Sequence, residues 1–256
     1  MKPSDLLINN SGAVRTLVYR TYRLVGLTKD KDAPIFGCGS GFFIESQNKE
    51  AYFVLTFHQY RNLFNCKAIA LTHHDDYRKE TSGILIFDDL NHPDCFNDHI
   101  VIADLDIVLV PLNVRVNKDV RLWGEQSFWY LNYGPKELAS FSTEIYFCGY
   151  PTDTNGVHLY ENRTITQNQA IESSSEWSFG VKGIEIDATS MANRKQGMAL
   201  SNGMSGGPIF TLRFNSQTSI SVALLGVITH RSSSPPKIFG TSFFEIFDRI
   251  GIDDYA

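Results

Sequence analysis

The residues best suited to chemistry in this sequence surround Ser205, in the stretch SNGMSGGPIF (201–210). Gly203, Gly206 and Gly207 stand within two residues of Ser205, ahead of an apolar run. Glycine lets a backbone turn sharply and approach other groups closely. The stretch therefore indicates either a plain glycine-rich turn or a turn that exposes the Ser205 hydroxyl as a nucleophile and directs backbone N–H groups at its target.

A serine nucleophile needs a base, and the base needs an orienting carboxylate. Among seven histidines, His58 follows the apolar run YFVLTF, so the sequence predicts it at a strand end. Asp106, in ADLDIVLVPL, is predicted to begin another apolar strand and to be partly buried there. The alternatives are a core histidine at position 58 and a strand-start cap at position 106. In the second case Asp104, expected to be solvated, would substitute for Asp106.

The composition narrows the function classes. The chain has 256 residues, 43% hydrophobic and 20% charged, which is typical of a globular protein with a substantial core. A net charge of −5 argues against general nucleic-acid binding. No apolar stretch reaches roughly 18 residues, so no membrane span is expected. The N-terminal region lacks a signal-peptide pattern, so a cytoplasmic location is predicted.

Metal and cofactor sites are not predicted. The loops THHDD (72–76) and NHPDCFNDH (91–99) contain ligand-type residues, but their spacing selects no coordination geometry, so solvated loops are expected. The four cysteines have no CxxC spacing and are expected to be reduced, buried apolar side chains. They are Cys38, Cys66, Cys95 and Cys148.

The rest of the chain is dominated by short apolar runs between turn signals, the pattern of β-strands. The exception is 243–250, where Phe243, Phe247 and Ile250 have helical spacing, so a short amphipathic helix is predicted. An all-β fold of two packed barrels or a sandwich is therefore expected, with a linker in the irregular region 113–143. The predicted strands are 13–19, 41–44, 51–56, 67–72, 83–87, 106–112, 144–148, 183–186, 208–212 and 219–229.

Four ordered blocks resemble the chymotrypsin/trypsin-like serine proteases, and within them the bacterial trypsin-like, HtrA-like branch. The blocks are GSGFFI (39–44), VLTFH (54–58), DIVLVPL (106–112) and GMSGGPIF (203–210). The resemblance implies two six-stranded antiparallel β-barrels, one in 1–120 carrying His58 and Asp106 and one in 121–256 carrying Ser205.

The same resemblance implies a role for each matching residue. His58 matches the general base, Asp106 its orienting partner and Ser205 the nucleophile. The backbone N–H groups of Gly203 and Ser205 match the oxyanion hole. Thr229 matches a hydroxyl residue that braces the aspartate from behind.

Two departures from the family pattern change the expectations. Gln59 stands where the family has a cysteine, so the disulfide that brackets the histidine loop is absent. Met204 stands where members activated by cleavage carry an aspartate that pairs with the new N-terminus. Activation by N-terminal insertion is therefore not expected, and the oxyanion loop must be ordered intrinsically or by a partner protein.

The resemblance also locates a substrate pocket. Its floor falls at Ala199, where trypsin-like members carry an aspartate that selects Lys and Arg, so a basic preference is not expected. Arg231 is expected to favour an acidic residue before the cut, with a small apolar residue as the alternative if Arg231 faces solvent. The residues predicted to line the wall and mouth are Ile228, Thr229, His230 and Arg231.

The function expected from these residues is a serine endopeptidase that cuts protein or peptide substrates through an acyl-enzyme. The alternative is a catalytically dormant protease-fold module that recruits a partner protein or is activated by one. An esterase of the α/β-hydrolase type is disfavoured, because it would need the chain order Ser, Asp, His.

Overall fold

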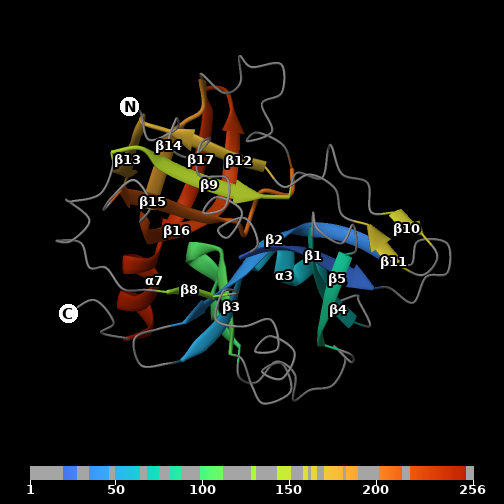
Figure 1. Ribbon diagram of the computed structural model, residues 1–256. Helices are drawn as coiled ribbons and strands as arrows, with labels where there is room; N and C mark the ends of the chain where they lie inside the picture. The colour runs from blue at the N-terminus through green and yellow to red at the C-terminus, as the bar shows by residue number, and fades with distance from the viewer. Residues whose placement is uncertain are drawn as a thin grey trace.

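The computed structural model describes a set of separate stretches of the chain, and strands predominate in them (Figure 1). Most of these strands belong to two large sheets, and two short ones, β10 (His158–Tyr160) and β11 (Arg163–Ile165), pair with each other. The described residues are 20–27, 35–45, 50–63, 68–74, 81–87, 99–111, 128–130, 143–150, 158–160, 163–165, 170–180, 183–189, 202–214 and 220–251.

The first large sheet has the order β5-β4-β1-β2-β3-β7-β6, and β8 pairs with β2. Neighbouring strands are antiparallel except for the parallel pair of β2 and β8. Its strands are β1 (Thr21–Leu27), β2 (Ile35–Glu45), β3 (Ala51–Thr56), β4 (Ala68–His74), β5 (Thr81–Phe87), β6 (Ile100–Ile102), β7 (Ile107–Pro111) and β8 (Phe128–Tyr130).

The second large sheet is antiparallel, with the order β12-β9-β15-β16-β17-β14-β13. In Figure 1 it lies above the first sheet. Its strands are β9 (Ile145–Gly149), β12 (Ala170–Ser174), β13 (Trp177–Gly180), β14 (Gly183–Asp187), β15 (Pro208–Phe214), β16 (Ile220–Ser233) and β17 (Pro236–Ser242).

Aromatic side chains from both sheets form one hydrophobic core. Trp129 of β8 packs on Phe210 of β15 with ring centroids 5.0 Å apart, and Phe42 of β2 packs edge-on against Phe243, at 6.2 Å. All four side chains are almost completely buried. A second cluster, which includes Phe147, Met204, Ile209 and Ile228, fills the other face of the second sheet. The two sheets are therefore joined by shared apolar contacts.

The helix predicted at the C-terminal end is confirmed as α7 (Phe243–Ile250). The Ser242 hydroxyl accepts a hydrogen bond from the Phe244 N–H at its start, and Gly251 ends it in the left-handed conformation. Phe243 and Phe247 face the core, as their spacing predicts.

The position predicted for His58 at a strand end is wrong. The strand predicted at 51–56 is confirmed as β3, but His58 does not end it, because the chain turns at Phe57 into the short helix α3 (Phe57–Leu63). The backbone N–H of Thr56 donates to Oε1 of Gln59, 3.1 Å away. This side chain reaches back to the residue before the helix, as in a capping box.

The fold class is confirmed at a coarse level: mostly β-strand, two large sheets and a short C-terminal helix. The described strands do not close either sheet into a barrel, so two six-stranded barrels stay a prediction. Part of the predicted linker, β8, pairs with β2, and Thr72–His74 of the predicted loop THHDD lie in β4. The predicted strand at 13–19 lies outside the described residues.

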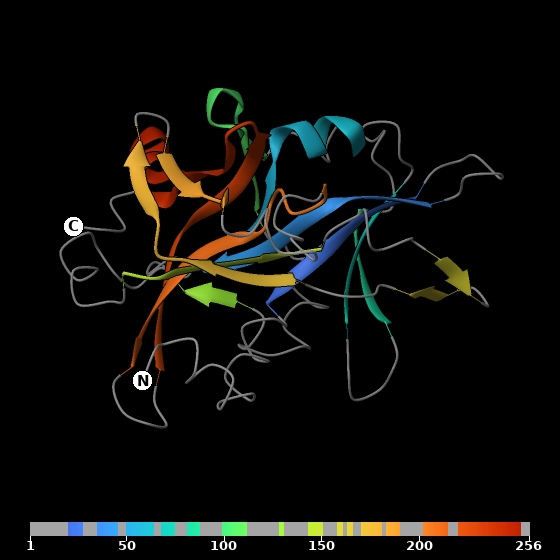
Figure 2. The same ribbon diagram turned by 90° about the horizontal axis from the view of Figure 1, so that it is seen from above.

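The helices are short in the described part of the chain, and none of them is long and apolar enough to cross a membrane. Figure 2 shows α3, α7 and the 3-10 helix η2 (Ala103–Leu105) on one side of the sheets. His58 lies in α3, and Asp106 directly follows η2.

Candidate active site

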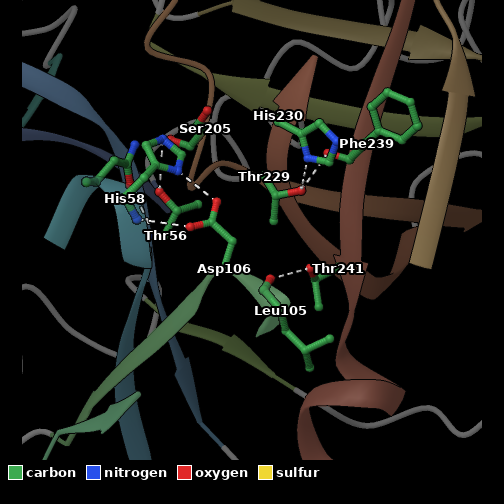
Figure 3. A network of polar contacts seen from close by, with 10 residues as sticks. Thr56, His58, Leu105, Asp106, Ser205, Thr229, His230, Phe239 and Thr241 are labelled. Carbon is green, nitrogen blue, oxygen red and sulfur yellow. Dashed lines mark hydrogen bonds and ion pairs between the residues drawn. The ribbon is translucent and has the colours of Figure 1, made fainter. Parts of the chain in front are cut away.

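His58 and Asp106 form a two-point contact (Figure 3). One carboxylate oxygen of Asp106, Oδ1, accepts from the backbone N–H of His58 at 2.9 Å, and the other, Oδ2, lies 2.7 Å from Nδ1 of the imidazole. The side chains are 49% and 30% exposed. Because both oxygens contact the same residue, the contact fixes the orientation of the ring as well as its position.

The register of the first sheet brings these two residues together. β3 pairs antiparallel with β7, and Thr56 lies opposite Ile107. His58 and Asp106 therefore emerge at the same edge of the sheet. The backbone carbonyl of Asp106 also accepts from the Phe57 N–H at 3.0 Å, so Asp106 satisfies two of the first donors of α3.

Asp106 does not begin a strand, contrary to the prediction. It follows η2 and adopts a left-handed conformation with φ of 57°, one residue before β7. Asp and Asn tolerate this region better than most residues other than glycine. The carbonyl of the preceding Leu105 accepts from the Thr241 hydroxyl of β17 at 2.8 Å, which ties the turn to the second sheet.

The contact with Asp106 determines the tautomer of His58. A carboxylate only accepts hydrogen bonds, so Nδ1 carries the proton and Nε2 of the neutral ring is an acceptor. This is the form that can take a proton from a hydroxyl. In this structure the Thr56 hydroxyl lies 3.4 Å from Nε2, a long hydrogen bond.

Ser205 lies beside the helix that carries His58 (Figure 3). Its backbone carbonyl accepts from Nε2 of Gln59 at 2.5 Å and from the backbone N–H of Ser40 in β2 at 2.9 Å. The turn that contains Ser205 precedes β15 of the second sheet, whereas Ser40 lies in β2 and Gln59 lies in α3. Two donors from the first half of the chain thus hold the Ser205 turn, which belongs to the second half.

The backbone around Ser205 is shaped by glycines in left-handed conformations. Gly203 has φ of 92° and Gly206 has φ of 82°. The Gly203 carbonyl accepts from the Ser40 hydroxyl at 2.8 Å, so this carbonyl points into the protein. The N–H groups of Gly203 and Ser205 donate to no acceptor within the described stretches. Both N–H groups thus lack a protein partner within that part of the chain.

Met204 anchors this turn in the apolar cluster of the second sheet. Its side chain is 3% exposed and packs among side chains such as Ile209 and Ile228. An apolar contact therefore occupies the place where the resemblance would put an ion pair with a cleaved N-terminus.

The predicted pocket residues are placed only in part. Ala199 lies outside the described residues. Ile228 is buried, while His230 is exposed and stacks on Phe239 with centroids 4.5 Å apart. Arg231 is exposed and donates from Nη2 to Oδ1 of Asn202, 3.0 Å away on the turn before Gly203.

The role expected of Thr229 is not observed. Its hydroxyl donates to the Phe239 carbonyl at 3.3 Å and lies 3.1 Å from Nδ1 of His230. These partners lie on β16 and β17, so the hydroxyl does not brace Asp106. The Thr241 hydroxyl makes the contact between the second sheet and the aspartate turn instead, through Leu105.

Asp104, the alternative to Asp106, points elsewhere. Its carboxylate pairs with Arg249 of α7 at 2.7 Å, and both side chains are more than half exposed. The expectation that Asp104 is solvated is confirmed. Among the two candidates, the structure brings Asp106 to the histidine.

Sequence reasoning missed three supporting residues: Ser40, Gln59 and Thr241. Gln59 carried a readable signal, because Thr56 and Gln59 have the spacing T-x-x-Q of a capping box. Ser40 and Thr241 act across more than a hundred residues of sequence, and no local pattern marks such contacts.

Comparisons with known proteins do not assign this chain to a family. Neither the protein-family models nor the curated proteins give a significant match to this chain. Within the described stretches, no group of three or more His, Cys, Asp or Glu side chains could hold a metal ion.

Proposed function

We propose that this protein is a serine endopeptidase of the chymotrypsin/trypsin-like type, with His58, Asp106 and Ser205 as its triad. In this proposal two β-barrels face each other across the site, with residues 1–120 supplying the base and residues 121–256 the nucleophile. Protein or peptide chains are the substrates, and no cofactor takes part.

The observation that carries the proposal is the two-point contact of Asp106 with His58, beside Ser205. In the proposed reaction Nε2 of His58 takes the proton of the Ser205 hydroxyl while Oγ bonds to the substrate carbonyl carbon. The C–N bond then breaks, and His58 passes the proton to the leaving amine. Water hydrolyses the resulting ester in the same way.

The glycine turn around Ser205 supports stabilisation of the tetrahedral intermediate. The carbonyl oxygen of the substrate becomes negatively charged in the tetrahedral intermediate and needs hydrogen-bond donors. The N–H groups of Gly203 and Ser205 are the proposed donors. The buried Met204 side chain supports a turn that is ordered without cleavage of the chain.

The test is labelling of the full-length, untrimmed chain by a fluorophosphonate probe. We expect wild type to label and to cleave a peptide library, and Ser205→Ala to do neither. Ser178→Ala is the matched control, because Ser178 is an exposed serine on β13 away from the site. Equal labelling of wild type and Ser205→Ala would exclude the proposed nucleophile.

A dormant protease-fold module is the second candidate, and one observation favours it. Nε2 of His58 lies 3.4 Å from the Thr56 hydroxyl, and the Ser205 hydroxyl makes no hydrogen bond within the described residues. In a dormant module a protein partner would have to turn the two groups toward each other. Wild type that folds but neither labels nor cleaves would favour this candidate.

Arg231 is the proposed determinant of specificity. Arg231 is exposed, and a small apolar preference therefore stays the alternative, but its guanidinium contacts the neutral Asn202 side chain next to the proposed oxyanion turn. Among the described residues no carboxylate pairs with it. A substrate carboxylate could supply the missing counter-charge, so an acidic residue before the cut is the proposed preference.

A further inference from the structure

Gln59 is the residue through which the helix that carries His58 contacts the turn that carries Ser205. It follows His58 in α3, and its side chain is 1% exposed. The amide oxygen accepts from the Thr56 N–H at 3.1 Å, and the amide nitrogen donates to the Ser205 carbonyl at 2.5 Å. One planar group therefore contacts the start of the helix and the candidate nucleophile at the same time.

Two glycines make room for this amide. A Cβ atom on Gly39 would lie 1.8 Å from Nε2 of Gln59, and a Cβ atom on Gly206 would lie 2.8 Å from its Oε1. Real Cβ atoms do not approach other heavy atoms this closely. The amide therefore lies in a narrow space between the two glycines, and its position can change little.

The Ser205 carbonyl has two donors, and they differ in what they connect. The Ser40 N–H joins it to β2, and the Gln59 side chain joins it to α3. Loss of the Gln59 bond would leave the carbonyl paired with Ser40, so the turn need not unfold. It would lose the contact that relates the position of Ser205 to that of His58.

We infer that Gln59 is a positioning residue, which holds Ser205 at a fixed position relative to His58. The inference rests on the proposed function. The amide does not touch the substrate and acts through the Ser205 backbone. A displacement of about 1 Å between reacting groups can lower a rate by roughly 100-fold. Loss of this contact should therefore reduce the rate of the chemical step and leave substrate binding nearly unchanged.

Two substitutions distinguish the hydrogen bond that the Gln59 amide donates from the space that its side chain fills. Gln59→Met is similar in size but lacks both polar atoms. Gln59→Glu keeps an acceptor for the Thr56 N–H, and it keeps a donor to the Ser205 carbonyl only while the carboxyl group is protonated. A buried carboxyl group has a raised pKa, so this variant should lose its donor as the pH rises.

The experiment measures kcat, KM and fluorophosphonate labelling rate between pH 5 and pH 9. Gln59→Met should lower kcat and the labelling rate by about 10- to 100-fold with KM within about twofold. Gln59→Glu should have its optimum shifted to lower pH than wild type. Tyr60→Phe is the matched control on the same helix, since the Tyr60 hydroxyl bonds to His99, and it should stay within about twofold.

Each result has one meaning. If wild type does not label, the proposed function fails, and the positioning role that rests on it fails too. If wild type labels and both variants keep its kcat and pH profile, the positioning role is overturned while the proposed function stands. If both variants unfold at all pH values in a circular dichroism melt, Gln59 is a structural residue and the inference is again overturned.

Discussion

At the scale of single residues, the geometry separates two aspartates that lie two positions apart. Asp106 contacts His58 through both carboxylate oxygens, and Asp104 contacts Arg249 on the surface. Nothing in the string ADLD distinguishes their chemistry. The left-handed turn at Asp106 is what directs its side chain to the imidazole.

The first prediction compares these aspartates. Asp106→Asn should lower kcat by about 10³- to 10⁴-fold, because the amide no longer stabilises the protonated ring or selects the tautomer. Asp104→Asn should stay within about twofold of wild type, since its ion pair is exposed and contributes less than about 1 kcal/mol. Cleavage rates of the two purified variants, with melting temperatures as the folding check, decide between them. A larger loss of kcat in Asp104→Asn than in Asp106→Asn would exclude Asp106 as the orienting carboxylate.

A second prediction concerns Arg231. The wild-type protein should cut after acidic residues, and Arg231→Ala should reduce that preference by about 10-fold, equivalent to roughly 1.4 kcal/mol of lost charge-assisted binding. Asn202→Ala is the companion variant, because it removes the Arg231 partner and keeps the guanidinium. A cleavage profile over a peptide library measures both. Efficient cutting after Lys or Arg, or an acidic preference that survives Arg231→Ala, would contradict the prediction.

At the scale of elements, the Ser205 turn depends on its close approach to β2. A Cβ atom on Gly206 would lie 2.0 Å from the backbone carbonyl oxygen of Ser40, and the backbone there has φ of 82°. The strand and the turn can therefore pack together only while position 206 has no side chain. Gly251, at the end of α7, has φ of 70° and no heavy atom within 4 Å of such a Cβ.

The third prediction uses this pair of glycines. Gly251→Ala meets only the backbone penalty and should lower the free energy of unfolding by about 1 kcal/mol. Gly206→Ala adds a clash with backbone and should lower it by about 2–5 kcal/mol and abolish labelling of Ser205. Urea unfolding curves of the two variants give the difference. Equal losses would mean that the approach of the turn to Ser40 is not tight.

The elements also show what the sequence could predict. Alternating and continuous apolar runs mark the strands well, because burial on a sheet leaves a local period, and β3 and α7 match their predicted ranges. The helix α3 was not predicted, because the apolar run before it continues to Phe57. The T-x-x-Q spacing was the only local mark of the change, and His58 therefore lies in a helix and not at a strand end.

For the candidate site, the sequence predicts residues and not the contacts between them. Places at the ends of apolar runs indicated His58 and Asp106 as candidates, flanking glycines indicated Ser205, and the family resemblance assigned each a role. The contacts that hold them could not be predicted. Ser40 and Ser205 are far apart in the sequence, and the Thr241 contact with Leu105 depends on how the two sheets pack.

At the scale of the whole molecule, burial raises the pKa of several side chains that lose a proton at alkaline pH. Burial raises the pKa of the Cys148 thiol to about 12, although a hydrogen bond with Thr21 opposes this. Burial also raises the pKa of Tyr60, and burial with the nearby Glu144 raises that of Tyr146. Each group keeps its proton in the folded protein at a pH where the unfolded chain would release it.

The fourth prediction follows from the sign of these shifts. The unfolded thiol loses its proton near pH 9.0. The stabilising contribution is therefore complete below that pH and is lost as the pH rises toward the folded value, by about 1.4 kcal/mol per pH unit for Cys148. Urea unfolding at pH 8, 9 and 10 should show this decline, and Cys148→Ala should reduce its slope. An unchanged slope would mean that the thiol titrates normally in the folded state.

The shared core has a consequence for how the chain can be divided. Trp129 lies before the segment that connects the two sheets, and its partner Phe210 lies after it. Cutting the chain between β8 and β9 would place these contacting rings on separate fragments, each exposing an aromatic surface in water. The two pieces should be poorly folded alone and should reassemble when mixed, so the protein could serve as a split reporter whose signal depends on fragment concentration.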